Sequence, residues 1–223
     1  MELPKETLHG KWYDDACGTA FALEVIGERW ALLVVRELML GPLRFSDLRG
    51  GLPGISAKIL TERLAGLERA GVVQRRQLPP PAAAQVYALT EWGLLAEPAI
   101  QELGRWAARS PAHDPQLPLS PVSLMMSLRT MLDRKAARDV TADVGFAIAG
   151  QEFRARLADR KLPIVREPVA GAEVIARAPQ AALIAGAIYD GLDPADLTGL
   201  SITGDLRQWR RFARLFSLPP KVG

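Results

Sequence analysis

Cysteine and histidine are nearly absent from this sequence, which has one cysteine, Cys17, and two histidines. A single cysteine excludes an intramolecular disulfide and a thiolate cluster for a structural metal. The two histidines fall in segments without helical or strand periodicity, and the sequence has neither a glycine-rich phosphate loop nor a nucleophile paired with a base. We therefore expect no metal, no cofactor and no catalytic residue, and hence a protein that is not an enzyme.

Long apolar runs are absent as well. Near the N-terminus the longest is "WALLVV", far shorter than the roughly 20 residues that span a bilayer. The first ten residues, "MELPKETLHG", mix charges with proline and lack the apolar stretch of a secretory signal. We expect a cytoplasmic protein with no membrane partner.

A large net charge is also missing, but the charge is unevenly distributed. The net charge of +3 does not by itself indicate a nucleic-acid-binding protein. Residues 1–42 carry four basic and seven acidic side chains, whereas residues 43–76 carry seven basic and three acidic ones. The chain average therefore hides a basic segment in the N-terminal half.

The length of 223 residues predicts two domains of about 100 residues each. The stretch "SPAHDPQLPLSPVS", residues 110–123, holds four prolines and leaves no room for a periodic element. Helical patterns dominate before it, and alternating strands first appear after it. We predict an N-terminal domain over residues 1–110, a linker over 111–120 and a C-terminal domain over 121–223.

Helical patterns fill most of the first domain. Two amphipathic helices cover about residues 20–26 and 30–40, and the second stops at Gly41-Pro42. A short helix in "FSDLRGG" follows, with Ser46 as its candidate N-cap.

The segment "GISAKILTERLAGLERAGVVQRR", residues 54–76, predicts an amphipathic helix and then a strand. Ser56 is a good N-cap, Ile55 occupies the position of a hydrophobic staple, and Gly71 suits the left-handed conformation that ends helices. Two opposite faces result, one with Leu60, Leu64 and Leu67 and the other with Lys58, Thr61, Glu62, Ala65 and Arg69. Such a helix is either a core helix with a solvated outer face or a helix that lies in the major groove of DNA.

Two strand-like runs, "VVQRRQL" and "AAQVYALT", flank a proline-rich turn and predict a hairpin over residues 72–90. Thr90 is the candidate N-cap of a final helix over residues 91–108, whose apolar residues include Trp92, Leu95, Leu103 and Trp106. A helix, a turn, a second helix and a two-stranded wing in this order form a winged helix-turn-helix.

The blocks "IGERW", "RFSDL", "PGISAKILTERLAGLERAGVVQRR" and "YALTEWG" resemble the HxlR-type winged-helix transcriptional regulators of bacteria and archaea. The resemblance covers about residues 17–108. It implies a homodimer that binds double-stranded operator DNA. The helix after Ser56 would lie in the major groove, and the hairpin over residues 72–90 would lie over the backbone or the minor groove. The apolar residues of the first and last helices of this domain would form the dimer contact.

The residue chemistry supports the same assignment. The amide end of a helix capped by Ser56 favours phosphate, and Lys58 extends from its first turn. Thr61 can meet a thymine methyl group, and Glu62 can accept a hydrogen bond from a cytosine amino group. Contacts with backbone phosphates are predicted for Arg44, Ser46, Arg75 and Arg76.

Two further charged residues of this helix, Arg63 and Glu68, are not placed among the DNA contacts. Arg63 lies toward the edge of the buried face, where an ion pair within the protein and a DNA contact are both open. Glu68 is expected to be structural.

Two features depart from the family pattern. The wing tip reads "LPPPAAAQ" where basic or polar residues are common, so we place the backbone contacts on Arg75 and Arg76. Cys17 stands where some family members have a cysteine that senses oxidants or electrophiles, but glycine follows it in place of the usual proline. Cys17 is thus a candidate redox sensor. Sensing needs a lowered pKa, which Asp14 and Asp15 should raise, and the alternative is an inert, buried side chain.

The C-terminal half predicts an α+β domain. A methionine-rich helix begins near residue 122, two alternating strands meet in a hairpin at Gly150-Gln151, and further strand-like pieces alternate with an apolar helix and a final aromatic one. The closing pattern, with "GLSITGD" and "LFSLP", resembles the sterol carrier protein type 2-like domain over about residues 120–220. The resemblance implies an apolar tunnel and hence a small hydrophobic effector, with lining residues that we do not name.

The predicted fold class of the whole chain is therefore α+β, with a mostly helical winged helix-turn-helix followed by a sterol-carrier-like α+β domain. A packed second domain that serves only in dimerisation or as a spacer is the alternative. The rival function is a carrier of lipids or small hydrophobic molecules that uses the winged helix as an interaction module.

Overall fold

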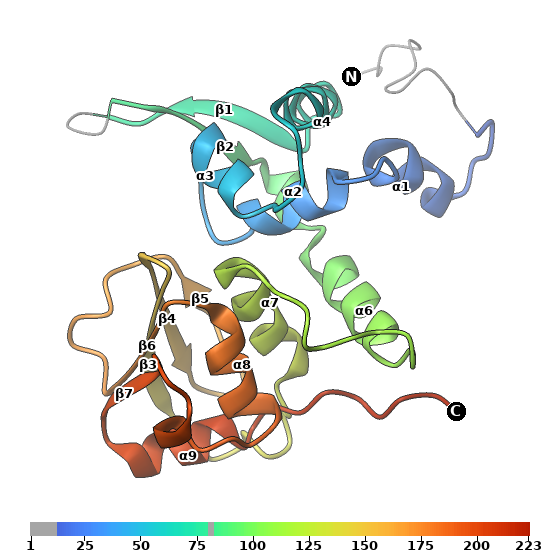
Figure 1. Cartoon of the computed structure of the whole chain (residues 1–223). Coiled ribbons are helices and arrows are strands. Elements are labelled where there is room, and N and C mark those ends of the chain that lie inside the picture. The colour runs from blue at the N-terminus through green and yellow to red at the C-terminus, as the bar shows by residue number, and fades with distance from the viewer. Residues whose placement is uncertain (1–12, 80–82) are drawn as a thin grey trace. The chain divides into compact units, whose positions relative to one another are not determined.

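The structure, a computed structural model, describes residues 13–79 and 83–223. The first ten residues, where no secretory signal is expected, and the middle of the predicted wing tip lie outside the described residues. The chain divides into two compact units, Met1–Ile100 and Gln101–Gly223 (Figure 1). The division falls inside a helix, α6 (Glu97–Ala108), whereas the sequence predicts a linker at residues 111–120.

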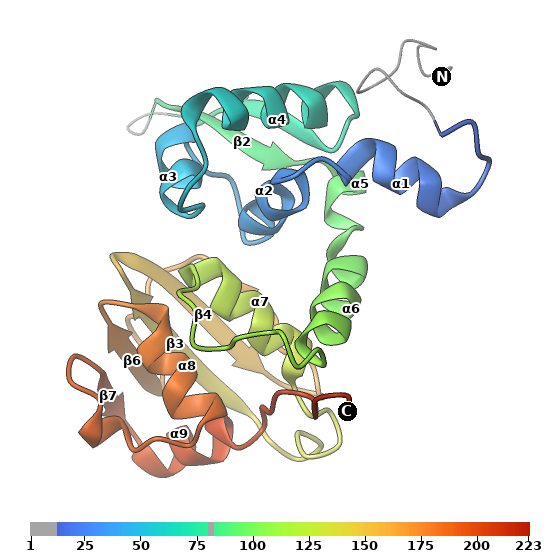
Figure 2. The same cartoon turned by 45° about the vertical axis from the view of Figure 1, so that its right-hand side comes forward.

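The first unit is a winged helix-turn-helix. Its elements are α1 (Gly18–Ile26), α2 (Ala31–Leu38), α3 (Phe45–Gly50), α4 (Ala57–Arg69), β1 (Val73–Gln77), β2 (Gln85–Leu89) and α5 (Glu91–Leu94). The two strands pair antiparallel, with Val73 opposite Leu89 and Gln77 opposite Gln85. Figure 2 shows α4 running alongside this two-stranded wing.

Leucines from α2, α3, α4 and the turn between α3 and α4 are the largest side chains in the core of this unit. The fully buried ones include Leu38, Leu48, Leu52, Leu60, Leu64 and Leu67. Leu60, Leu64 and Leu67 recur at the spacing of one helical face, so the predicted core face of α4 is confirmed.

Two predictions about helix limits in this unit are wrong. Ser46 is not the N-cap of α3, because the backbone carbonyl of Arg44 already accepts a hydrogen bond from the Leu48 amide, and the helix begins at Phe45. The single helix predicted over residues 91–108 is divided into α5 and α6. Pro98 explains the break, because proline lacks the amide hydrogen of an unbroken helix and its ring clashes with the preceding turn.

The second unit is a mixed sheet with helices. After α7 (Pro121–Met131) come β3 (Ala142–Ile148), β4 (Gln151–Leu157), β5 (Ile164–Val165), β6 (Val174–Ala178), α8 (Ala181–Tyr189), η1 (Pro194–Asp196), β7 (Ser201–Gly204) and α9 (Leu206–Ala213). The strand order is β5-β4-β3-β6-β7, in which β3 pairs antiparallel with β4 and parallel with β6. Figures 1 and 2 both show α7 and α8 on one face of this sheet.

The β3–β4 hairpin is shifted by one residue from its predicted position. Ile148 pairs with Gln151, so the turn residues are Ala149 and Gly150, with φ angles of 50° and 77°. A two-residue hairpin turn with positive φ at both positions matches the twist of the strands. Gln151 therefore belongs to β4 and not to the turn.

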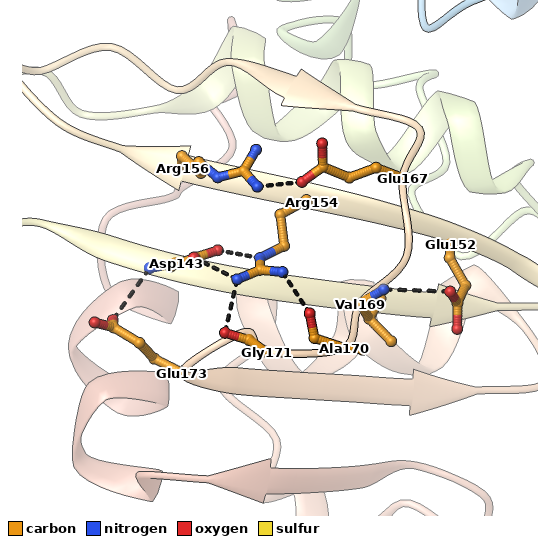
Figure 3. A network of polar contacts seen from close by, with 9 residues as sticks. All are labelled: Asp143, Glu152, Arg154, Arg156, Glu167, Val169, Ala170, Gly171 and Glu173. Carbon is orange, nitrogen blue, oxygen red and sulfur yellow. Dashed lines mark hydrogen bonds and ion pairs between the residues drawn. The ribbon is translucent and has the colours of Figure 1, made fainter.

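Arg154 on β4 holds a loop against the face of the sheet opposite to α9. Phe146 of β3, which contacts Phe212 of α9, pairs with Phe153, so the next residue, Arg154, points to the other face. Its guanidinium is paired with Asp143 and donates to the carbonyls of Ala170 and Gly171 (Figure 3). This ion pair raises the pKa of Arg154 above its ordinary value. A buried arginine that is paired with Asp143 and donates to two loop carbonyls thus fixes the loop that leads into β6.

The C-terminal tail is fixed to the end of α6 and to the residues that follow it. The Lys221 ammonium group donates hydrogen bonds of 3.1, 3.0 and 2.9 Å to the carbonyls of Ala108, Ser110 and His113. A cation at the last carbonyls of α6 is favourable because those groups have no partner within the helix. In residues 13–79 and 83–223, no helix has the length and apolar character needed to cross a membrane.

Candidate nucleic-acid interface

The turn between α3 and α4 is fixed by buried side chains and one glycine. Leu52 and Ile55 are 2% and 5% exposed, and the Ile55 amide donates a 3.1 Å hydrogen bond to the Leu52 carbonyl. Gly54 between them has a backbone φ of 90°, which residues other than glycine rarely adopt. The turn therefore sets the direction in which α4 begins.

Both ends of α4 are capped as predicted. The Ser56 hydroxyl accepts a 3.2 Å hydrogen bond from the Ile59 amide, which confirms Ser56 as the N-cap. At the other end Gly71 has a φ of 74°, the Val72 amide donates to Leu67 and the Gly71 amide donates to Glu68. These two bonds form a Schellman motif.

Lys58, Thr61 and Glu62 lie on the exposed side of α4, which we call the outward face of α4. The Thr61 hydroxyl donates a 2.9 Å hydrogen bond to the Ala57 carbonyl within the helix. Its proton is therefore used within the helix, and its methyl group and acceptor lone pairs are left for an outside contact. Lysine donates, glutamate accepts and the threonine methyl is apolar, so the face carries three different kinds of contact group.

Arg63 makes an ion pair within the protein. Its guanidinium lies 3.1 Å from a carboxylate oxygen of Glu28, and its side chain is only 15% exposed. Of the two roles that the sequence left open, the structure shows the intramolecular one.

Arg75 and Arg76 point to opposite faces of the wing, because neighbouring residues of a strand alternate. The Arg75 guanidinium lies 3.0 Å from Glu68 of α4 and 5.6 Å from the ring centre of Tyr87. Glu68 thus has the structural role expected for it. Arg76 pairs across the strands with Val86 and is exposed. The two arginines therefore do not present one common surface.

Arg44 and Ser46 are both exposed at the start of α3. Arg44 occupies the N-cap position, and the Ser46 hydroxyl lies 3.1 Å from the Asp47 carboxylate, to which it donates. The structure thus brings Arg44 and Ser46 together on α3, and Ser56, Lys58, Thr61 and Glu62 together on α4.

Comparisons with known proteins agree with this architecture. The model of the HxlR-like helix-turn-helix family matches residues 25–114. YvaP, an uncharacterized HTH-type transcriptional regulator of Bacillus subtilis (strain 168), is 37% identical over 86 residues, which cover 39% of this chain and 80% of YvaP. The chain belongs to the HxlR family of helix-turn-helix transcriptional regulators.

Two further matches concern YodB, an HTH-type transcriptional regulator of the same organism. YodB is 40% identical over 86 residues, which cover 39% of this chain and 77% of YodB. The solved structure of its reduced form is 35% identical, with a TM-score of 0.40, and the match covers 45% of this chain and 100% of that chain. HxlR proteins are DNA-binding regulators and not enzymes. The family match ends at residue 114, so it says nothing of the five-stranded sheet.

The alternative role for Cys17 was an inert, buried side chain with a raised pKa, and the structure of this HxlR protein differs on burial and on pKa. The side chain is exposed, so the expectation of a buried thiol is wrong. Amide groups at the start of α1 lower the pKa of Cys17, with Ala20 first and Thr19 second, although neither amide has the geometry of a side-chain cap. The expected increase from Asp14 and Asp15 is therefore wrong too, because these amides stabilise the thiolate. The Asp15 carboxylate instead accepts a hydrogen bond from the Cys17 amide at 2.9 Å.

Exposed apolar side chains occur on the helices that flank the winged helix. In the first unit they are Leu23, Trp92, Leu94 and Leu95, at 49%, 47%, 48% and 75% exposed. On α6, within the second unit, Leu103 and Trp106 are 47% and 74% exposed. The sequence pattern placed Leu23 among the apolar residues of the first helix, whereas Leu94 was not singled out, and its signal is its place beside Trp92 and Leu95 in an apolar segment. Such patches commonly mark protein contacts.

One buried charge near the interface was also missed. Glu37 of α2 is 2% exposed and accepts a 2.8 Å hydrogen bond from Arg36. A β-carbon at Gly51, after α3, would lie 2.7 Å from a carboxylate oxygen of Glu37, so a larger residue there would require the end of this side chain to shift. Within the described parts of the chain, no group of three or more His, Cys, Asp or Glu residues could hold a metal ion.

Proposed function

We propose that this HxlR regulator recognises a specific DNA operator as a homodimer, with α4 in the major groove. The observation that carries the proposal is the outward face of α4, where Lys58, Thr61 and Glu62 are exposed on the side opposite to three buried leucines. Thr61 would meet a thymine methyl group, and Glu62 would accept from a cytosine amino group. Ser56 at the amide end of the helix and Lys58 would bind phosphate.

Further phosphate contacts would fix the position of α4 on the duplex. Arg44 and Ser46 would supply them from α3, and Arg76 from the exposed side of the wing. Arg75 would contribute through its remaining N–H groups, since Glu68 and Tyr87 already hold its guanidinium in place.

Dimerisation would cover the exposed apolar residues of the flanking helices, which include Trp92, Leu95, Leu103 and Trp106. A two-fold dimer would place its two α4 helices at half-sites about 34 Å apart, one turn of the DNA helix. A protein that sediments as a monomer at all concentrations would contradict this arrangement.

The test compares binding to the DNA upstream of the chain's own gene with binding to random DNA over a salt series. We expect a higher affinity for the specific duplex. Lys58→Ala should weaken binding to both duplexes and reduce the salt slope by about 1, whereas Thr61→Ala should relax the preference at particular base pairs. Equal affinities for specific and random DNA would overturn the proposal.

The second unit is proposed to adjust DNA affinity in response to a small hydrophobic effector. This proposal rests on the resemblance to sterol carrier-like domains over about residues 120–220, and domain limits of 1–110 and 121–223 belong to it. The apolar interior between α7, α8 and the sheet, with Met125 and Met126 among its buried residues, is compatible with an apolar ligand. Native mass spectrometry of the purified chain should detect such a ligand, whose release would change DNA affinity. If the chain binds such a ligand but shows no preference for specific DNA, the rival function, a carrier of lipids or small hydrophobic molecules, is correct.

Cys17 is proposed as a redox-sensitive residue on the basis of its exposure and its lowered pKa. Oxidant treatment should change the DNA affinity of the wild-type chain and leave that of Cys17→Ser unchanged. An equal response of the two proteins would overturn this role.

A further inference from the structure

Helix α9 has one apolar and one strongly basic side. Trp209 and Phe212 are 2% and 0% exposed, and the Phe212 ring lies 6.2 Å from Phe146 of the sheet. Every arginine of α9 and of its C-cap is exposed, and their spacing of three, four and seven residues places them in one stripe, formed by Arg207, Arg210, Arg211 and Arg214.

A second basic segment, the turn over residues 133–139, lies against the end of α9. The Asp133 amide donates a 2.8 Å hydrogen bond to the Leu215 carbonyl, and the Arg211 guanidinium donates one of 2.8 Å to the Asp139 carbonyl. Ala137 in the middle of the turn is fully buried. The three cations of this turn are all exposed, namely Arg134, Lys135 and Arg138. The turn and the α9 stripe together form what we call the basic surface of the second unit.

The neighbouring carboxylates do little to neutralise this surface. Asp133 accepts hydrogen bonds from the Lys135 and Ala136 amides, at 2.8 and 3.1 Å, so it caps the turn. Asp205 caps α9 through the Arg207 amide and lies 3.7 Å from the Arg207 side chain, at the far limit of an ion pair. The third carboxylate is that of Asp139. The surface therefore has seven cations and three carboxylates, and the carboxylates of Asp133 and Asp205 are engaged with backbone amides.

We propose that the basic surface of the second unit binds the phosphate backbone of double-stranded DNA, as a DNA contact separate from the winged helix. Six of its seven cations are arginines, whose planar guanidinium groups match phosphate with two parallel hydrogen bonds. The family binds DNA through its winged helix, so the second unit is tethered to a duplex whenever that contact forms. The tether raises the local concentration of phosphate at the basic surface.

A membrane surface fits this region less well. Basic amphipathic helices that bind membranes insert their apolar side among the lipids. The apolar side of α9 is instead packed on the sheet, with Trp209 and Phe212 buried. DNA needs no apolar insertion, because release of counterions from the phosphates supplies the affinity.

The test uses the full chain and a fluorescent random-sequence duplex of about 40 base pairs, long enough for several helical turns. Arg207→Gln, Arg210→Gln and Arg214→Gln are combined in one variant, and Arg211 is kept because it bonds to the turn. We expect the variant to bind at least about tenfold more weakly at roughly 0.1 M salt, with a salt slope smaller by about 0.9 for each lost phosphate contact. The same three substitutions to lysine keep the charge and should retain most of the affinity.

A matched control separates position from charge. Arg177 on β6 is exposed in the same unit, so Arg177→Gln removes the same charge away from α9. We expect Arg214→Gln to reduce the salt slope and Arg177→Gln to leave it unchanged. Should the triple glutamine variant unfold, the single Arg210→Gln and Arg214→Gln variants decide by the same slope.

Three outcomes would overturn the proposal. The first is wild-type affinity and slope in the glutamine variants while Lys58→Ala still weakens binding, which leaves the winged-helix function intact. The second is an equal effect of Arg177→Gln and Arg214→Gln, which would reduce the surface to net charge. The third is binding to phosphatidylserine vesicles that depends on these arginines when duplex binding does not, which would assign the surface to membranes.

Discussion

Helices α4 and α9 share one plan and differ in what they show to solvent. Each buries an apolar side, Leu60 and Leu64 in α4 and Trp209 and Phe212 in α9, and each is capped at its start by a polar side chain. The outward face of α4 mixes a donor, an acceptor and a methyl group, whereas the exposed stripe of α9 consists of arginines. The amphipathic pattern thus predicts burial, and the composition of the exposed side indicates the kind of partner. A mixed face can distinguish base pairs, and a uniformly cationic face suits phosphates.

The largest effects should come from the buried sides, where the two helices are alike. Phe212→Ala should lower the free energy of unfolding of the second unit by about 3–5 kcal/mol, and Leu64→Ala that of the first by about 2–5 kcal/mol, because each leaves a cavity. Denaturant unfolding followed by circular dichroism measures both. A loss below about 1 kcal/mol for either would contradict the buried role of that side.

The exposed sides should respond in different ways to a change of charge. Glu62→Arg makes α4 resemble α9, so it should strengthen binding to random DNA and cost about 1–3 kcal/mol of discrimination at the contacted base pair. Arg210→Glu should weaken binding to specific and random DNA alike and leave their ratio unchanged. Titrations of both duplexes measure the ratio. If Glu62→Arg keeps the wild-type ratio, Glu62 does not read a base.

The two N-caps offer a smaller test of the shared plan. Ser56 accepts the Ile59 amide and Asp205 accepts the Arg207 amide, so Ser56→Ala and Asp205→Ala should each lower the free energy of unfolding by about 1 kcal/mol. Thermal unfolding of each variant checks this value, and the replacement of Ser56 by Thr or Asp provides the control that keeps a cap. No change with alanine would mean that the helix ends are held by packing alone.

The smallest expected effect is the pH dependence of the cap formed by Asp133, in the turn beside α9, which has no counterpart in α4. Hydrogen bonds from the Ala136 and Lys135 amides hold the pKa of Asp133, in the turn beside α9, below its ordinary value of 3.8. Because the folded-state pKa is depressed, the cap stabilises the turn above pH 3.8, and this stabilisation is lost as the pH falls further. An NMR titration should give a midpoint for Asp133 below 3.8. The Ser56 cap of α4 does not titrate, so a midpoint at or above that value would remove this difference between the helices.

Local signals predicted α4 well because its limits depend on near neighbours. Ser56 bonds three residues ahead, Gly71 closes the helix on its own last turn, and the leucines repeat with the helical period. The predictions that failed depended on competing local signals or on distant contacts. Pro98 outweighed the apolar pattern of the final helix, and the cap of α3 moved to Arg44 because the chain before it pairs with β2 at Tyr87.

Candidate site residues were predictable by type and less so by surroundings. The exposure of Lys58, Thr61 and Glu62 follows from the helical period alone. The ion-pair partner of Arg63 could not be predicted from the helical period, because Glu28 lies 35 positions earlier in the chain. The lowered pKa of Cys17 was also beyond the sequence pattern, because it depends on amides at the start of α1 and not on the charges of Asp14 and Asp15.

By itself the sequence determined the winged helix, the family and the residues of the α4 face, because periodicity, caps and motif order are local properties of the chain. Tertiary structure decided which charges pair and which gather. It joined Arg75 of the wing to Glu68 of α4, and it brought the turn at residues 133–139 to the arginines of α9, more than 60 positions away. Electrostatic interactions depend on distance in space, which the order of residues leaves open until the sheet and its helices have packed.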